Sequence, residues 1–97
     1  MRFVFQSSDL ERVYVTGTHP KWHPNLVKAF IRVVRTISQA PDERTLRGLK
    51  VLHMETLHGG RDGQYSVRVN DQYRLIYTIE RDDDGNLLLI IDVVDYH

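Results

Sequence analysis

Three arginines and a carboxyl-terminal histidine are the residues of this 97-residue chain best suited to chemistry. Arg61, Arg68 and Arg74 lie in the segment 57–77, and the last residue, His97, carries an imidazole. A guanidinium group binds phosphate through two parallel hydrogen bonds, and an imidazole exchanges a proton near neutral pH. These residue types together are suited to binding a phosphate group and to transferring a proton beside it.

The spacing of apolar residues predicts how two strands of this segment pair. Apolar and polar side chains alternate over residues 65–69 and again over residues 73–79, as in half-buried strands. A three-residue loop, Asn70–Gln72, places Val67 opposite Leu75 and keeps the apolar side chains on one face. A two-residue turn would mix core and solvent residues, so the three-residue loop is the prediction.

The same register places Arg68 directly opposite Arg74. Two adjacent cations on an open face repel each other and contribute nothing to folding, so each needs an anionic partner. Phosphate is one candidate. The alternative is that each arginine pairs with a nearby acid such as Asp71 or Asp95, and the residues alone leave both possibilities open.

The five histidines differ in their prospects. His53 and His58 lie around the strand that enters a Gly-rich turn, and either could be an ordinary surface residue. His19 and His23 have the spacing of a helical metal pair, but they lie in a loop with two prolines, which disfavours a zinc site. His97 is either a frayed tail or a site residue held in place by the strand that precedes it.

The remaining segments predict a scaffold of two helices and a short helical turn. A Ser8–Glu11 capping box begins a helix over 9–16, which Gly17 ends. Pro24 begins a longer helix with an apolar stripe, which stops at Ala40–Pro41. Asp42 caps a further turn over 42–48.

A second face of the longer helix is basic, with Lys28, Arg32 and Arg35 at i, i+4 and i+7. It could contact a polyanion, such as RNA or an acidic protein segment, or it could simply be solvated.

Strands are expected at residues 2–5, at 65–69 and 73–79, and at 87–94, after a turn over 82–86. The last of these, LLLIIDVV, is almost continuously apolar, which favours a central strand buried on both faces. Helices first and strands afterwards predict an α+β fold, with two N-terminal helices packed on one face of a small, mainly antiparallel sheet.

Bulk composition limits the possible functions. The chain is long enough for a single domain, residues 1–97, and its 41% hydrophobic and 27% charged residues are ordinary for a globular protein. A formal net charge of zero argues against indiscriminate nucleic-acid binding. The absence of cysteine excludes thiol chemistry. No signal peptide, membrane span or cofactor motif is recognised, so a cytoplasmic protein without metal or organic cofactor is expected.

Two elements are similar to a known family. Residues 57–74, LHGGRDGQYSVRVNDQYR, and the terminal VDYH resemble the HigB branch of the RelE/ParE toxins from bacterial type II toxin–antitoxin modules. The resemblance covers nearly the whole chain and implies a RelE-like fold. It also implies a metal-independent endoribonuclease that cuts mRNA on the ribosome. The partner would be a HigA-like helix-turn-helix antitoxin, and operator DNA would be bound only through the toxin–antitoxin complex.

The resemblance also implies roles for individual residues. Arg61, Arg68 and Arg74 match family arginines around the substrate phosphate, and the terminal Asp-Tyr-His matches residues that family members need for toxicity. His97 would act as acid or base with His58 as its partner, and Asp95 would orient His97 or Arg74. RNA would be contacted by Arg61, Arg68, Arg74, Tyr96 and His53, with Tyr96 stacking on a base.

The sequence departs from the family just before the Gly-rich turn. Many HigB toxins carry a lysine after the leucine that corresponds to Leu57, and some carry a histidine two residues before it. Here those positions hold His58 and Glu55, with His53 two residues further upstream. Glu55 could act as the base or face solvent. A ParE-like protein that poisons gyrase by binding, or a weakened toxin that only binds its antitoxin, are the alternatives.

Overall fold

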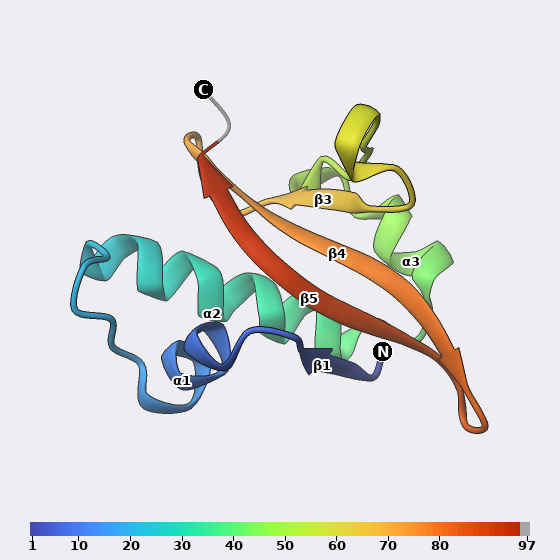
Figure 1. The fold of residues 1–97 in the computed structure, drawn as a ribbon, viewed down its shortest axis with the longest axis horizontal. Coiled ribbons are helices and arrows are strands. Elements are labelled where there is room, and N and C mark those ends of the chain that lie inside the picture. The colour runs from blue at the N-terminus through green and yellow to red at the C-terminus, as the bar shows by residue number, and fades with distance from the viewer. Residues whose placement is uncertain (96–97) are drawn as a thin grey trace.

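The computed structural model describes residues 1–95, which form helices packed against a twisted sheet (Figure 1). Within the described residues the sheet has five strands in the order β1-β5-β4-β3-β2. In chain order the elements are β1 (Phe3–Phe5), α1 (Ser8–Thr16), α2 (Pro24–Gln39), α3 (Glu43–Gly48), η1 (Lys50–Leu52), β2 (Glu55–Thr56), η2 (Gly59–Arg61), β3 (Tyr65–Arg68), β4 (Tyr73–Asp82) and β5 (Gly85–Asp95).

The topology confirms the α+β prediction. Strand β1 pairs with β5 in parallel, while β5-β4, β4-β3 and β3-β2 are antiparallel. The N-terminal helices α1 and α2 lie on one side of the sheet (Figure 1). The long β4–β5 hairpin crosses the whole molecule and brings the end of the described chain next to the β3–β4 turn.

Local sequence signals account for the helix ends, with one correction. The predicted Ser8–Glu11 capping box is wrong, because Ser7 is the N-cap and its Oγ accepts a hydrogen bond from the Leu10 amide at 3.2 Å. Helix α1 ends at Gly17, whose φ of 74° is in the left-handed region that glycine adopts without strain. Pro24 begins α2 and Asp42 caps α3, as the sequence predicts.

The core lies between α2 and one face of the sheet. The apolar stripe of α2 packs against alternate residues of β3, β4 and β5. The following residues of the core are almost completely buried: Phe30, Val34, Ile37, Leu46, Val67, Leu75, Tyr77, Leu88 and Ile90. The hairpin register is the predicted one, with Val67 opposite Leu75 and Tyr65 opposite Tyr77.

Strand β5 differs from the prediction of a strand buried on both faces. Only Leu88 and Ile90 are fully buried, and the apolar residues between and around them are half-buried. A β-bulge interrupts its pairing with β4, because Tyr77 lies opposite Ile90 whereas Ile76 lies opposite Asp92. Ile91 is therefore the extra residue, and the side chains after it point to the opposite faces from those that regular alternation would give.

No helix among residues 1–95 is both long enough and apolar enough to cross a lipid bilayer.

Candidate active site on the distal face of the sheet

The face of the sheet turned away from the core, hereafter the distal face, carries Arg68 and Arg74 and is reached by Arg61 through its contact with Asp92. Directly opposed residues of antiparallel strands point to the same face, so the register defines its members. One row runs across the strands from Glu55 through Ser66 and Ile76 to Asp92. The adjacent row contains Arg68, Arg74 and Val94.

Arg74 is the centre of this face and is buried, with 6% of its surface exposed. Its Nε donates to Ser66 Oγ at 2.8 Å, and its Nη2 donates to the Ser66 carbonyl oxygen at 3.3 Å. Nη2 also donates to the carbonyl oxygen of His53. The expectation that Arg74 lies on an open face is therefore wrong, because its guanidinium group joins β4, β3 and the segment that precedes β2.

Arg68 lies opposite Arg74 as predicted, but it is only half-buried, at the end of β3. Its Nη2 contacts the Asp71 carboxylate in the β3–β4 turn. An ion pair this exposed stabilises a fold only slightly. The alternative of a nearby acid is therefore correct for Arg68, and a phosphate would have to replace Asp71 as its partner.

Arg61 is brought across the sheet from the Gly-rich turn. Its Nη1 donates to Gln64 Oε1 at 2.9 Å, and its Nη2 lies 3.8 Å from Asp92 Oδ2. Gln64 belongs to the same loop as Arg61, whereas Asp92 lies on β5, which is separated from β2 by β3 and β4. Because the guanidinium group has five N–H donors, both contacts leave donors for a further anion.

The histidines of the described chain occupy different places. His53 ends η1 with a φ of 44°, an uncommon conformation for a non-glycine residue, and its carbonyl faces Arg74. His58 is exposed and immediately precedes η2. His23 caps α2 and His19 contacts Asp9 at 3.1 Å, so the two loop histidines have separate partners.

The chain approaches this site from its other end through β5. Asp95 pairs with Tyr73, one residue from Arg74, and accepts a hydrogen bond from Gln72 Nε2 at 2.9 Å. Tyr96 and His97, the residues expected to stack on RNA and to exchange the proton, lie outside the described residues. The contacts expected of Asp95 with His97 therefore cannot be compared with the structure.

Three residues that the sequence did not single out contribute to this site: Ser66, Gln64 and Asp92. Ser66 and Gln64 look like ordinary polar residues of a hairpin. Asp92 carried a signal, because it is the only charged residue within the apolar run 87–94. Its direction depends on the bulge at Ile91, which places it opposite Ile76 on the distal face.

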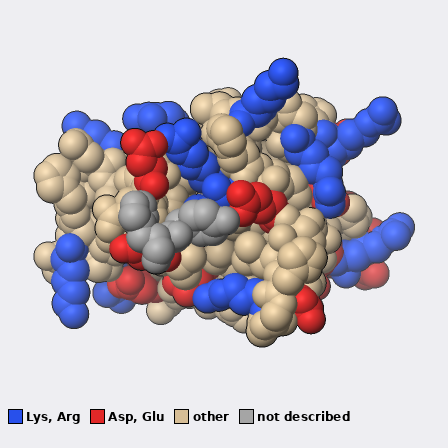
Figure 2. Space-filling model, turned by 90° about the horizontal axis from the view of Figure 1, so that it is seen from above, with Lys and Arg blue, Asp and Glu red and all other residues tan. Residues whose placement is uncertain are grey.

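The distal face combines guanidinium groups with carboxylates. Three guanidinium groups from separate segments reach it, and aspartates contact Arg61 and Arg68. Figure 2 shows the same mixture on a larger scale, with cationic and anionic side chains interspersed over one surface. Among residues 1–95 no group of three or more histidine, aspartate or glutamate side chains is arranged to hold a metal ion.

The fold is similar to that of solved toxin structures. The chain superposes over its full length on a YoeB/ParE toxin from Agrobacterium tumefaciens, with a TM-score of 0.65, 18% identity and full coverage of both chains. It also matches a heterotetrameric YoeB-YefM toxin-antitoxin complex from Staphylococcus aureus, with a TM-score of 0.59, 24% identity and coverage of 100% of this chain and 97% of the other. These likenesses define a RelE-like toxin fold.

Sequence comparison places the chain within that class. The family described as "RelE-like toxin of type II toxin-antitoxin system HigB" matches residues 3–97. The chain therefore belongs to the HigB-like family of type II toxins. It is also 37% identical to an uncharacterized protein from Haemophilus influenzae over 86 residues, which cover 88% of this chain and 85% of the relative.

Proposed function

We propose that this toxin is a ribosome-dependent, metal-independent mRNA endoribonuclease that blocks translation and arrests growth. The convergence of Arg61, Arg68 and Arg74 on the distal face supports the proposal most directly. The three come from η2, β3 and β4, and β5 delivers Asp95 to the same end of the sheet. Arg74 also contributes to folding, but partly exposed ion pairs such as those of Arg61 and Arg68 stabilise a fold only slightly, and a phosphodiester ligand would account for their presence.

The proposed chemistry uses the RNA's own 2′-OH as the nucleophile. A base removes its proton, the oxygen attacks the adjacent phosphorus, and an acid protonates the departing 5′-oxygen. His97 and His58 are the proposed acid–base pair, with Asp95 orienting His97. Tyr96 would stack on a base, and His53 would contact the RNA alongside it.

The arginines have different parts in this proposal. The side chains of Arg61 and Arg68 are accessible enough to bind a phosphate that displaces the aspartates they contact. Arg74 is held by Ser66 and His53, so it is preorganised and contributes a fixed positive charge near the developing phosphorane. Fixed charges that need no rearrangement during the reaction stabilise a transition state best.

The partners proposed here are a HigA-like helix-turn-helix antitoxin, the ribosome and mRNA. Operator DNA would be bound only through the toxin–antitoxin complex, and the toxin would act in the cytoplasm. The YoeB-YefM complex among the similar structures supports an antitoxin partner of some kind.

Growth arrest after induction tests the function. The parent should stop growth and leave cuts in translated mRNA that primer extension detects. His97→Ala and Arg61→Ala should abolish or strongly reduce both effects, while Arg81→Ala, an exposed arginine on the far part of β4, should not. Growth arrest with intact mRNA and inhibited gyrase supercoiling would instead indicate a ParE-like poison.

A further inference from the structure

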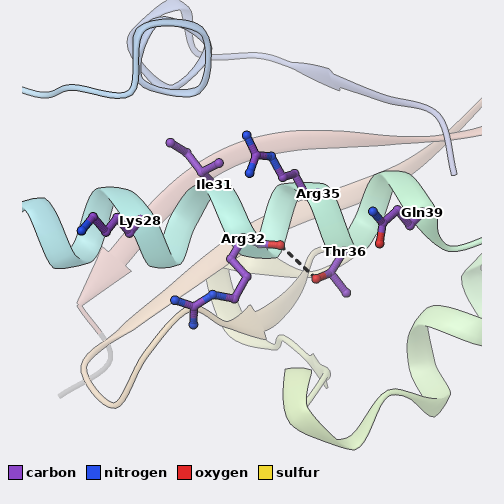
Figure 3. Close-up of a pocket in the computed structure, with 6 residues that line it drawn as sticks. All are labelled: Lys28, Ile31, Arg32, Arg35, Thr36 and Gln39. Carbon is purple, nitrogen blue, oxygen red and sulfur yellow. Dashed lines mark hydrogen bonds between the residues drawn. The ribbon is translucent and has the colours of Figure 1, made fainter.

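The exposed side of α2 is a cationic ridge made by Lys28, Arg32 and Arg35 (Figure 3). All three are exposed, and no carboxylate lies within ion-pair distance of any of them in residues 1–95. They extend over about 10 Å of helix, at a rise of about 1.5 Å per residue. Three unneutralised cations on one short surface oppose folding slightly and attract a polyanion.

The ridge is continuous with the distal face through a hollow beside α2. Arg32 lines this hollow from the helix, and Arg68 and Asp71 line it from the β3–β4 hairpin. In Figure 3 the Arg32 side chain extends away from α2 on the opposite side from Arg35. One arginine of the candidate site thus shares a hollow with one cation of the ridge.

The residues around the ridge fit a sugar–phosphate backbone better than nucleobases. Thr36 and Gln39 add polar side chains, Ile31 is the sole apolar side chain among the lining residues of the ridge, and none is aromatic. Single-stranded nucleic acid is held by stacking on aromatic rings and by cations along the backbone. The ridge offers cations for the backbone but no aromatic ring for stacking, so its binding to RNA would be independent of base sequence.

We infer that the cationic ridge binds the substrate RNA strand beyond the phosphate that is cleaved, with the strand passing from Arg68 through the hollow to Arg32. This inference rests on the proposed ribonuclease function and adds a second contact region to it. Asp71 would lose its contact with Arg68 as the strand enters. The ridge supplies affinity, whereas the distal face supplies the chemistry.

Fluorescence anisotropy with 2′-O-methyl RNA tests the ridge, because such RNA cannot be cleaved through its 2′-oxygen. Oligonucleotides of about 4 and about 16 nucleotides span the usual range of single-strand sites. The triple variant Lys28→Gln, Arg32→Gln, Arg35→Gln should bind the longer one roughly 10-fold to 100-fold more weakly and lower its salt slope by about 2, since each phosphate contact contributes about 0.7. The shorter one should bind as it does to the parent.

A matched variant removes the same charge elsewhere. Arg12→Gln, Arg44→Gln, Arg81→Gln changes three exposed arginines outside the ridge and should change the affinity for the longer RNA less than about threefold near 0.15 M salt, because distant charges are screened. Equal effects of the two triple variants would overturn the inference. So would a ridge variant that keeps RNA affinity but loses affinity for polyglutamate, which would assign the ridge to an acidic protein.

The ridge and the nuclease function fail separately. If the ridge variant loses affinity for the longer RNA while the parent cuts no mRNA in cells, the RNA-binding role of the ridge is supported and the nuclease function is contradicted. If the parent cuts mRNA and the ridge variant binds the longer RNA with the parent's affinity, the nuclease function is supported and the RNA-binding role of the ridge is contradicted.

Discussion

The two faces of the sheet are built from alternate residues of the same strands, but they are stabilised in different ways. On the core face Val67, Leu75 and Tyr77 pack against α2 and are fully buried. On the distal face Ser66 and Arg74 are also buried, yet they are held by directional hydrogen bonds. Burial alone therefore does not distinguish a packed core from a preorganised polar site, whereas the type of contact does.

The difference gives the distal face its functional potential. Apolar contacts are non-directional, and a core tolerates some change of shape. A buried guanidinium group tolerates little, since each donor needs an acceptor in place. The sheet thus presents a buried, hydrogen-bonded cation at Arg74 opposite Arg68, while Arg61 contacts Asp92 on the same face.

The largest expected effect is on the core face. Leu75→Ala should lower the free energy of unfolding by about 2–5 kcal/mol, because it removes a fully buried side chain and leaves a cavity. Urea denaturation followed by circular dichroism measures it. A change below about 1 kcal/mol would show that the core face is not the principal source of stability.

Arg74 tests the distal face at the neighbouring position. Arg74→Ala should cost about 1–3 kcal/mol, because the Ser66 hydroxyl and the His53 carbonyl lose their donor in a buried place. It should also remove growth arrest. Arg74→Lys keeps the charge without the planar fork, so it should recover part of the stability and little of the activity.

Arg68→Lys is the matched control, at the half-buried position directly opposite the buried Arg74. It should change stability by less than about 0.5 kcal/mol. If the two lysine variants were equally stable, the hydrogen bonds around Arg74 would not hold the distal face together.

The sequence predicted the core face better than the distal face. Strict alternation in 65–69 and 73–79 determined the β3–β4 register and hence the position of Arg68 opposite Arg74. The run 87–94 has no alternation, so neither the bulge at Ile91 nor the direction of Asp92 could be predicted. The burial of Arg74 could not be predicted either, because its guanidinium group donates to the backbone carbonyl of His53, which is distant in the sequence.

The bulge explains how an aspartate within β5 stays out of the core. Regular pairing beyond Ile90 would place Asp92 opposite Leu75 on the core face, at the cost of burying a carboxylate. Deletion of Ile91 should therefore be tolerated, since Asp92 would then follow Ile90 and still lie opposite Ile76. The loss of one half-buried isoleucine should cost about 1 kcal/mol, measured by urea denaturation.

Deletion of Asp92 instead of Ile91 is the control for the bulge. It also gives a regular ladder, but it places Ile91 on the distal face and removes the carboxylate that contacts Arg61. Both variants should fold, and only the second should lose much of its RNA cleavage. A ΔIle91 protein that is unfolded or inactive would contradict this account of the bulge.

Among residues 1–95, the hydroxyl of Tyr77 on the core face is the one buried side-chain polar atom that lacks a hydrogen-bond partner. Burial, more than the nearby Glu43 carboxylate, raises the pKa of the phenol above its ordinary value of 10.0. Tyr77→Phe should raise stability by about 1 kcal/mol at neutral pH, because it removes the desolvation cost of that hydroxyl.

The pH dependence of Tyr77 follows from linkage. The unfolded chain releases the phenol proton at a lower pH than the folded chain, so it binds fewer protons above pH 10.0 and stability falls as pH rises through that range. The advantage of Tyr77→Phe over the parent should therefore widen above pH 10.0 in chemical denaturation curves. Tyr65→Phe, at a half-buried position opposite Tyr77, is the comparison variant. A gap between parent and Tyr77→Phe that stays constant with pH would mean that the hydroxyl is hydrogen-bonded or hydrated in solution, and that the core face tolerates polar groups as the distal face does.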